Sequence, residues 1–205
     1  MNIIITGASR GLGYETVLRL SGDQRNHILA LARSGKKLEE LQKDCRSAYS
    51  GADVSVLPFD ILGDDHLRLT RLIETKFDGK LHLLINNAGA MINKPFEALK
   101  DEDFEALWRS NFLGPVRMIR TLLSYMSSGA HILNIGSMGG FQGSDKFPGL
   151  TAYSASKAAL HNLTECLAGE LEDRKIRINC LALGSAQTEM LEQAFPGYES
   201  PVSAV

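Results

Sequence analysis

Short apolar segments alternate with longer amphipathic segments along most of the chain. The short segments are rich in Ile, Val and Leu without polar alternation, which is typical of strands covered on both faces of a sheet. The longer segments carry apolar residues at helical spacing, and they separate each predicted strand from the next. The predicted strands lie within residues 2–6, 27–32, 53–60, 81–89, 131–137 and 176–184.

This alternation predicts an α/β fold, namely a Rossmann-like, doubly wound parallel sheet with helices on both faces. The expected strand order is 3-2-1-4-5-6, with ligands bound at the carboxyl ends of the strands. One long helix is expected from about Asp101 to Met126, and another from Tyr153 to Asp173. Because no linker or repeat interrupts the pattern, residues 1–205 are predicted to form a single domain.

The composition is that of an ordinary soluble globular protein, with 44% hydrophobic and 22% charged residues. The formal net charge of −2 does not favour a nucleic-acid or membrane-surface partner. No apolar run reaches the roughly 20 residues that span a membrane. The N-terminal segment has the pattern of a strand rather than that of a signal peptide.

The three cysteines include no CxxC pair, so a disulfide framework or a zinc site is not expected. This cysteine usage favours a reducing compartment, by default the cytoplasm. Cys166 and Cys180 are predicted to be small core residues. No two of the five histidines have the spacing of metal ligands, and no bound metal is expected.

A glycine-rich turn, "TGASRGLG" (Thr6–Gly13), connects the first predicted strand to the first predicted helix. Its spacing is G-x-x-x-G-x-G, and glycines there allow a pyrophosphate to approach the backbone and the helix N-terminus. The alternative is a glycine-rich connection in an unrelated α/β protein. The candidate cofactor-binding residues of this turn are Gly7, Ser9, Arg10, Gly11, Leu12 and Gly13.

The end of the second predicted strand indicates which dinucleotide would bind. NAD sites place an acidic residue there, whereas this chain has Arg33 followed by Ser34. Together with Arg10, Arg33 favours NADP(H) over NAD(H), because guanidinium groups bind phosphate with paired hydrogen bonds. Both arginines could instead be solvated surface residues. Asp60 could accept a hydrogen bond from the adenine amine or cap the following helix.

Further motifs follow the glycine turn at the ends of predicted strands: "NNAG" at Asn86–Gly89, Ser137, and Tyr153-x-x-x-Lys157. Each is weak alone, since Tyr and Lys at this spacing commonly form a half-buried ring beside a lysine stem. In this order they make the chain resemble the short-chain dehydrogenase/reductase family over nearly all of its length.

The resemblance implies a dinucleotide-binding catalytic domain that transfers hydride between NADP(H) and a small-molecule carbonyl or secondary alcohol. It also implies a homodimer or homotetramer. The implied catalytic tetrad is Asn111, Ser137, Tyr153 and Lys157. The implied further cofactor contacts are Asn87, Ala88, Gly89, Tyr153, Lys157, Gly184 and Thr188.

The Tyr–Lys pair suits such a reaction, because a ketone that accepts hydride also needs a proton. A phenol has a pKa near 10, and the neighbouring ammonium group of Lys157 is expected to lower the pKa of Tyr153. Ser137 is expected to donate a hydrogen bond to the carbonyl oxygen on which charge grows.

Asn111 lies four residues before Pro115 in the long predicted helix. Because proline has no N–H, the Asn111 carbonyl loses its usual helical partner, and a kink is expected there. The family resemblance implies that this carbonyl holds a water that links Asn111 to Lys157. The alternative is a plain kink with Asn111 facing solvent.

The chain also departs from the family pattern. Leu183 precedes Gly184 where the family usually has proline, and the segment between Ser137 and Tyr153 is slightly long, which makes it a candidate substrate wall. The chain ends at Val205, whereas the family continues with another helix and a seventh strand, so the domain is expected to be C-terminally short.

Two apolar groups have more than one interpretation. Met190, Leu191 and Phe195 could form a substrate lid or an ordinary amphipathic turn. Trp108 and Phe112 are expected in the core or at a subunit interface.

Two functions follow from this pattern. The first is an NADP(H)-dependent oxidoreductase with a tyrosine acid. The second, motivated by the short C-terminus, is a non-catalytic nucleotide-binding scaffold or sensor with the same fold.

Overall fold

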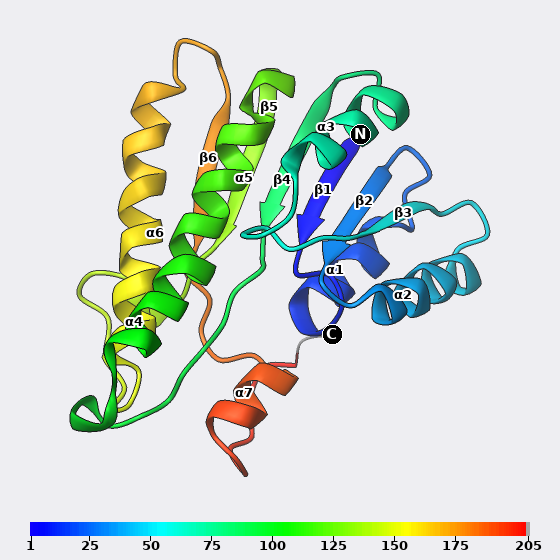
Figure 1. Cartoon of the computed structure of the whole chain (residues 1–205). Coiled ribbons are helices and arrows are strands. Elements are labelled where there is room, and N and C mark those ends of the chain that lie inside the picture. The colour runs from blue at the N-terminus through cyan, green and yellow to red at the C-terminus, as the bar shows by residue number, and fades with distance from the viewer. Residues whose placement is uncertain (204–205) are drawn as a thin grey trace.

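A computed structural model of the chain, which describes residues 1–203, contains one parallel sheet with strand order β3-β2-β1-β4-β5-β6 (Figure 1). This confirms the predicted fold class and strand order. The structure extends the fifth strand toward its N-terminus and ends the third, fifth and sixth strands before their predicted limits, while the predicted segment 81–89 divides into β4 and the turn that follows it. The strands are β1 (Asn2–Thr6), β2 (His27–Ala32), β3 (Asp53–Pro58), β4 (Leu81–Asn86), β5 (Met126–Ile135) and β6 (Arg177–Leu181).

Helices connect successive strands, as right-handed crossovers in a parallel sheet require. Short 3-10 turns cover Phe96–Ala98, Leu123–Tyr125 and Met138–Gly140, and a π-helical turn covers Arg109–Leu113. The α-helices are α1 (Gly11–Leu20), α2 (Gly35–Ala48), α3 (His66–Lys76), α4 (Asp101–Trp108), α5 (Gly114–Leu122), α6 (Thr151–Glu170) and α7 (Glu189–Ala194).

The core has two layers, one on each face of the sheet. On one face, Val17 of α1 and Leu38 of α2 pack against β1 and β2. On the other face, Leu69 of α3 and Met118 of α5 pack against the same strands and against β4 to β6. Because both faces of the central strands are covered, their apolar runs show no polar alternation.

The long helix predicted from Asp101 to Met126 is interrupted by the π-helical turn Arg109–Leu113. The N–H of Gly114 donates to the carbonyl of Arg109, five residues earlier. Pro115 supplies no N–H to the Asn111 carbonyl, so the hydrogen-bond ladder is irregular where the kink was expected. Asn111 itself is fully buried, which excludes the alternative that it faces solvent.

Cys166 lies on an exposed position of α6, so its prediction as a core residue is wrong. The helical pattern of α6 turns this position away from the sheet. Cys180 is half-buried on β6. Within residues 1–203, no helix has both the length and the apolar character that a membrane crossing requires.

Candidate functional site

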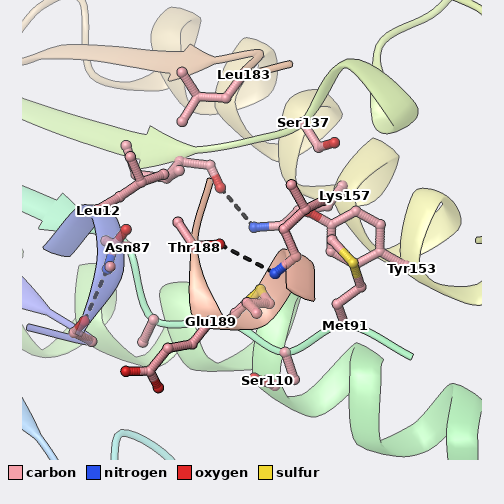
Figure 2. A pocket seen from close by; sticks show the side chains of 18 of the residues that line it. Leu12, Asn87, Met91, Ser110, Ser137, Tyr153, Lys157, Leu183, Thr188 and Glu189 are labelled. Carbon is pink, nitrogen blue, oxygen red and sulfur yellow. Dashed lines mark hydrogen bonds between the residues drawn. The ribbon is translucent and has the colours of Figure 1, made fainter. Parts of the chain in front are cut away.

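A cavity of about 1360 Å³ lies at the carboxyl ends of the strands, between the glycine turn, α6 and α7 (Figure 2). Pockets for one small molecule commonly measure about 300–1,000 Å³, so this cavity can hold a cofactor together with a substrate. It is lined by most of the residues that the sequence predicted, namely Gly7, Ser9, Arg10, Gly11, Leu12, Arg33, Asp60, Asn87, Ala88, Gly89, Ser137, Tyr153, Lys157, Gly184 and Thr188.

The backbone of the glycine turn would be disrupted if its glycines carried side chains. Gly7 and Gly11 have φ angles of 68° and 54°, in the left-handed region. A Cβ on Gly13 would lie 2.4 Å from the Gly7 carbonyl oxygen, so Gly13 serves the packing of the turn and does not line the cavity. Arg10 gives α1 no side-chain cap, and the first-turn amides suit a diphosphate group.

The segment after β4 is fastened to the glycine turn. The Asn87 side-chain amide donates to the carbonyl oxygens of Thr6 and Gly7, each at 3.1 Å. The backbone N–H groups of Asn87 and Ala88 donate to the Thr6 hydroxyl at 3.1 and 3.0 Å. These bonds hold the ends of β1 and β4 together at the floor of the cavity.

Asn111 does not line the cavity but supports the segment beside it. Its side-chain oxygen accepts from the Ala90 N–H at 2.8 Å, and its amide nitrogen donates to the Ala90 carbonyl at 2.9 Å. The same nitrogen donates to the Ser156 hydroxyl at 3.0 Å. Asn111 therefore fixes the backbone after "NNAG" against α6.

A buried polar chain, not recognised in the sequence, links the sheet to α6. Asn86 donates to the side chain of Asn134 at 2.9 Å, and Asn134 donates to the Thr164 hydroxyl at 2.9 Å. All three residues are at most 5% exposed. Because these side chains come from β4, β5 and α6, no local sequence pattern indicated that they would meet.

Tyr153 and Lys157 lie on the buried face of α6, where they are 7% and 5% exposed. Lys157 Nζ donates to the carbonyl oxygen of Ile135 at 2.7 Å, at the end of β5 (Figure 2). The ammonium nitrogen is 6.0 Å from the centre of the Tyr153 ring. Helical spacing thus places the phenol and the ammonium group in one corner of the cavity.

The pKa values of this pair differ from the sequence-based expectation. Burial raises the pKa of Tyr153, and a hydrogen bond with the Ser137 side chain offsets only part of that rise. Lys157 was expected to lower the pKa of Tyr153, but it does not. Burial instead lowers the pKa of Lys157 itself to about 8. Tyr153 is therefore a neutral phenol at neutral pH.

Basic side chains lie at the end of the cavity away from Tyr153. Arg10 Nη1 lies 3.0 Å from the carboxylate of Glu189, and Lys37 Nζ lies 3.7 Å from the same oxygen. Arg33 forms no ion pair with any of the residues that the structure describes. The three cations Arg10, Arg33 and Lys37 line one region, and no acidic residue stands at the end of β2.

Asp60 lines the cavity, and its carboxylate accepts from the Leu62 N–H at 2.9 Å. It does not cap the following helix, because Asp65 is the N-cap of α3 and accepts from Leu67. The helix-cap alternative for Asp60 is therefore wrong.

Several lining residues were not identified as functional from the sequence. Lys37 could have been identified from the sequence, since it stands four residues after Arg33 at the start of a predicted helix. No sequence feature identified Glu189, because only the fold brings α7 to the glycine turn. Apolar side chains also line the cavity, and they include the candidate lid residues of α7 and members of the candidate substrate wall after Ser137. These side chains are Met91, Met138, Phe147, Leu150, Leu183, Met190, Leu191 and Phe195. Of these, Met91, Leu150 and Phe195 pack in one cluster with Tyr153. Among residues 1–203, no group of three or more His, Cys, Asp or Glu could hold a metal ion.

The sequence of the chain is similar to those of known reductases and dehydrogenases. A fatty acyl-CoA reductase of Acinetobacter baylyi is 32% identical over 193 residues, which are 92% of this chain but only 63% of that protein. An NADP-dependent 3-hydroxy acid dehydrogenase of Schizosaccharomyces pombe is 32% identical over 200 residues, 95% of this chain and 75% of that protein.

The fold is also similar to solved structures of dehydrogenases. A dehydrogenase/reductase from Sinorhizobium meliloti has a TM-score of 0.80 at 28% identity, over 92% of this chain and 73% of that one. The sequence model of the short chain dehydrogenases matches residues 1–199. With the strand order, the glycine turn and the Tyr–Lys pair in one cavity, this match shows that the chain belongs to the short-chain dehydrogenase family.

Proposed function

We propose that this protein is an NADP(H)-dependent oxidoreductase that interconverts a small-molecule carbonyl and its secondary alcohol, with Tyr153 as the acid and base. The observation that carries the proposal is that Ser137, Tyr153 and Lys157 share one cavity with the glycine turn. A scaffold that only bound nucleotide would not need a buried phenol and a buried ammonium group in the reacting corner.

The residues divide the chemistry between them. The nicotinamide supplies hydride when bound. The Tyr153 phenol, which its raised pKa keeps protonated at neutral pH, donates a proton to the developing alkoxide in the direction of carbonyl reduction. Ser137 donates a hydrogen bond to the same oxygen. Lys157 holds its ammonium group in the same corner, 6.0 Å from the centre of the Tyr153 ring, where its remaining donors would bind the hydroxyl groups of the nicotinamide ribose.

The preference for NADP(H) is supported by the three cations Arg10, Arg33 and Lys37 beside the glycine turn. Phosphate binds guanidinium groups through paired, charge-assisted hydrogen bonds. The absence of an acidic residue at the end of β2 removes the usual partner of an NAD ribose. The NADP dependence of the similar 3-hydroxy acid dehydrogenase from Schizosaccharomyces pombe agrees with this preference.

We also propose that the protein works as a homodimer or homotetramer in the cytoplasm. Trp108 and Phe112 support an assembly, because their ring centres lie 4.3 Å apart and Trp108 is 43% exposed. The apolar residues around Tyr153 support a small organic substrate rather than a polymer.

The test is oxidation of NADPH with a panel of aldehydes and ketones, comparing wild type with Tyr153→Phe. We expect kcat to fall by at least about 100-fold in the variant, because general acid catalysis contributes roughly 10²–10⁴-fold. NADPH binding, measured separately by fluorescence, should be retained.

Tyr198→Phe is the matched control, because Tyr198 also lines the cavity but is exposed and is not placed in the reaction. It should behave as wild type in both assays. Equal turnover by Tyr153→Phe and wild type would contradict the proposed acid. NADPH binding without turnover of any carbonyl by wild type would favour the nucleotide-binding sensor instead.

A further inference from the structure

Glu189, the first residue of α7, connects three distant segments of the chain. Its carboxylate contacts Arg10 at 3.0 Å and Lys37 at 3.7 Å. Arg10 belongs to the glycine turn and Lys37 to the first turn of α2. Figure 2 shows the Glu189 carboxylate pointing away from Tyr153 and Lys157, so it does not belong to the reacting corner.

The partners of Glu189 are two of the three cations that line the cofactor end of the cavity. Arginine binds carboxylate and phosphate with the same planar set of donors, so one anion can replace the other. The Arg10 hydrogen bond, followed by the charge of Lys37, lowers the pKa of Glu189, which keeps the carboxylate ionised at neutral pH. The Glu189 carboxylate thus already satisfies donors that a phosphate group would need.

We propose that Glu189 is a specificity-determining residue, which competes with the cofactor's 2′-phosphate for Arg10 and Lys37. The inference rests on the proposed NADP(H) function. A phosphate monoester carries about 1.5 to 2 negative charges at pH 7, so it displaces a single carboxylate. NAD(H) has no such group and leaves both ion pairs intact. Glu189 therefore weakens the binding of NADP(H) and leaves that of NAD(H) nearly unchanged.

The ion pairs of Glu189 are suited to displacement. Arg10 and Glu189 have side chains that are 41% and 53% exposed, and exposed ion pairs contribute little to stability. Other bonds hold α7 in place without Glu189. Asn93 donates to the Ala194 carbonyl at 2.7 Å and joins α7 to the segment after β4, while the Thr188 hydroxyl caps the helix by accepting from the Leu191 N–H at 3.2 Å.

The test is titration of wild type and Glu189→Gln with NADPH and with NADH, followed by fluorescence or calorimetry. Glutamine keeps the size of the side chain and removes the charge. We expect NADPH to bind about threefold to tenfold more tightly to the variant, and NADH affinity to change by less than about twofold. The gain in NADPH affinity should shrink at high salt, because exposed charges are screened.

Glu192→Gln is the matched control. It removes the same charge one turn further along α7, where Glu192 accepts from the Gly197 N–H and contacts neither cation. We expect it to leave the ratio of the two affinities unchanged. Lys37→Gln should have the opposite effect to Glu189→Gln, with weaker binding of NADPH only.

The outcomes separate this inference from the proposed function. If wild type binds neither cofactor, the proposed function and the role of Glu189 are both overturned. If wild type binds NADPH and the ratio of affinities is the same in Glu189→Gln, only the role of Glu189 is overturned. Loss of NADH affinity in Glu189→Gln would also overturn it, because Glu189 would then hold a ribose hydroxyl.

Discussion

Lys157 carries an ammonium group that is buried without a carboxylate partner among the described residues. Its protein contact is the Ile135 carbonyl, and burial lowers its pKa from 10.5 to about 8. Burying a charge in this way costs stability, and such buried groups with shifted pKa values are common at functional sites. In the proposed reaction, this ammonium group would lie beside the bound substrate and cofactor.

This burial predicts how stability depends on pH. The pKa of Lys157 is lowered in the folded state, so between pH 8 and 10.5 the unfolded chain binds more protons, and stability rises with pH. In urea unfolding, wild type should gain about 2 kcal/mol relative to Lys157→Met between about pH 7 and 9.5. The raised pKa of Tyr153 acts above this range and is common to both proteins. Parallel pH profiles would contradict a lowered pKa for Lys157.

Individual residues of the candidate site were predictable where a motif fixes both the residue type and its position in the fold. Tyr153 and Lys157 share a helix face because of their spacing, and the cavity contains both. The pKa of Tyr153 was not predictable, since its direction depends on burial that arises from packing between α6 and the rest of the fold. Glu189 was missed for a similar reason, because its partners come from distant segments.

At the scale of elements, the π-helical turn between α4 and α5 places Asn111 behind the "NNAG" segment. The sequence predicted a kink from the position of Pro115, and the structure has an irregular turn there. The hydrogen bonds of Asn111 to Ala90 and Ser156 had no local signal. These hydrogen bonds connect the π-helical turn to the segment after β4 and to α6.

These bonds predict a large effect of Asn111→Ala. The substitution would leave the Ala90 N–H and carbonyl without their partner in the protein interior, and each such loss costs about 1–3 kcal/mol. We expect the free energy of unfolding to fall by about 2–4 kcal/mol in urea denaturation. Ser110→Ala is the control, since this neighbouring side chain lines the cavity and should change stability by less than about 0.5 kcal/mol. Equal stability of the two variants would contradict the supporting role of Asn111.

At the scale of the whole molecule, the sheet order followed from the sequence because parallel α/β topologies are few. Both faces of β1 and β2 are covered by helices, and the cavity opens at the carboxyl ends of the strands as expected. The proposed assembly does not follow from these rules, because it depends on which side chains α4 and α5 expose rather than on the order of the strands.

The proposed assembly predicts the behaviour of Trp108, the single tryptophan of the chain. If the α4–α5 surface contacts a second subunit, acrylamide should quench Trp108 fluorescence less at high protein concentration than after dilution. Light scattering on the same samples should show the change in mass. A monomer at all concentrations, with Trp108 quenched as an exposed residue, would contradict the proposal.

The most direct test of the central claim follows the hydrogen that is transferred. Wild type would be incubated with NADPH deuterated at the nicotinamide and a mixed panel of aldehydes and ketones, and the products analysed by mass spectrometry. We predict an alcohol that contains one deuterium, formed by wild type and Tyr198→Phe and nearly absent with Tyr153→Phe. Bound NADPH with no deuterated alcohol from any carbonyl would contradict the oxidoreductase and leave a protein that only binds the nucleotide.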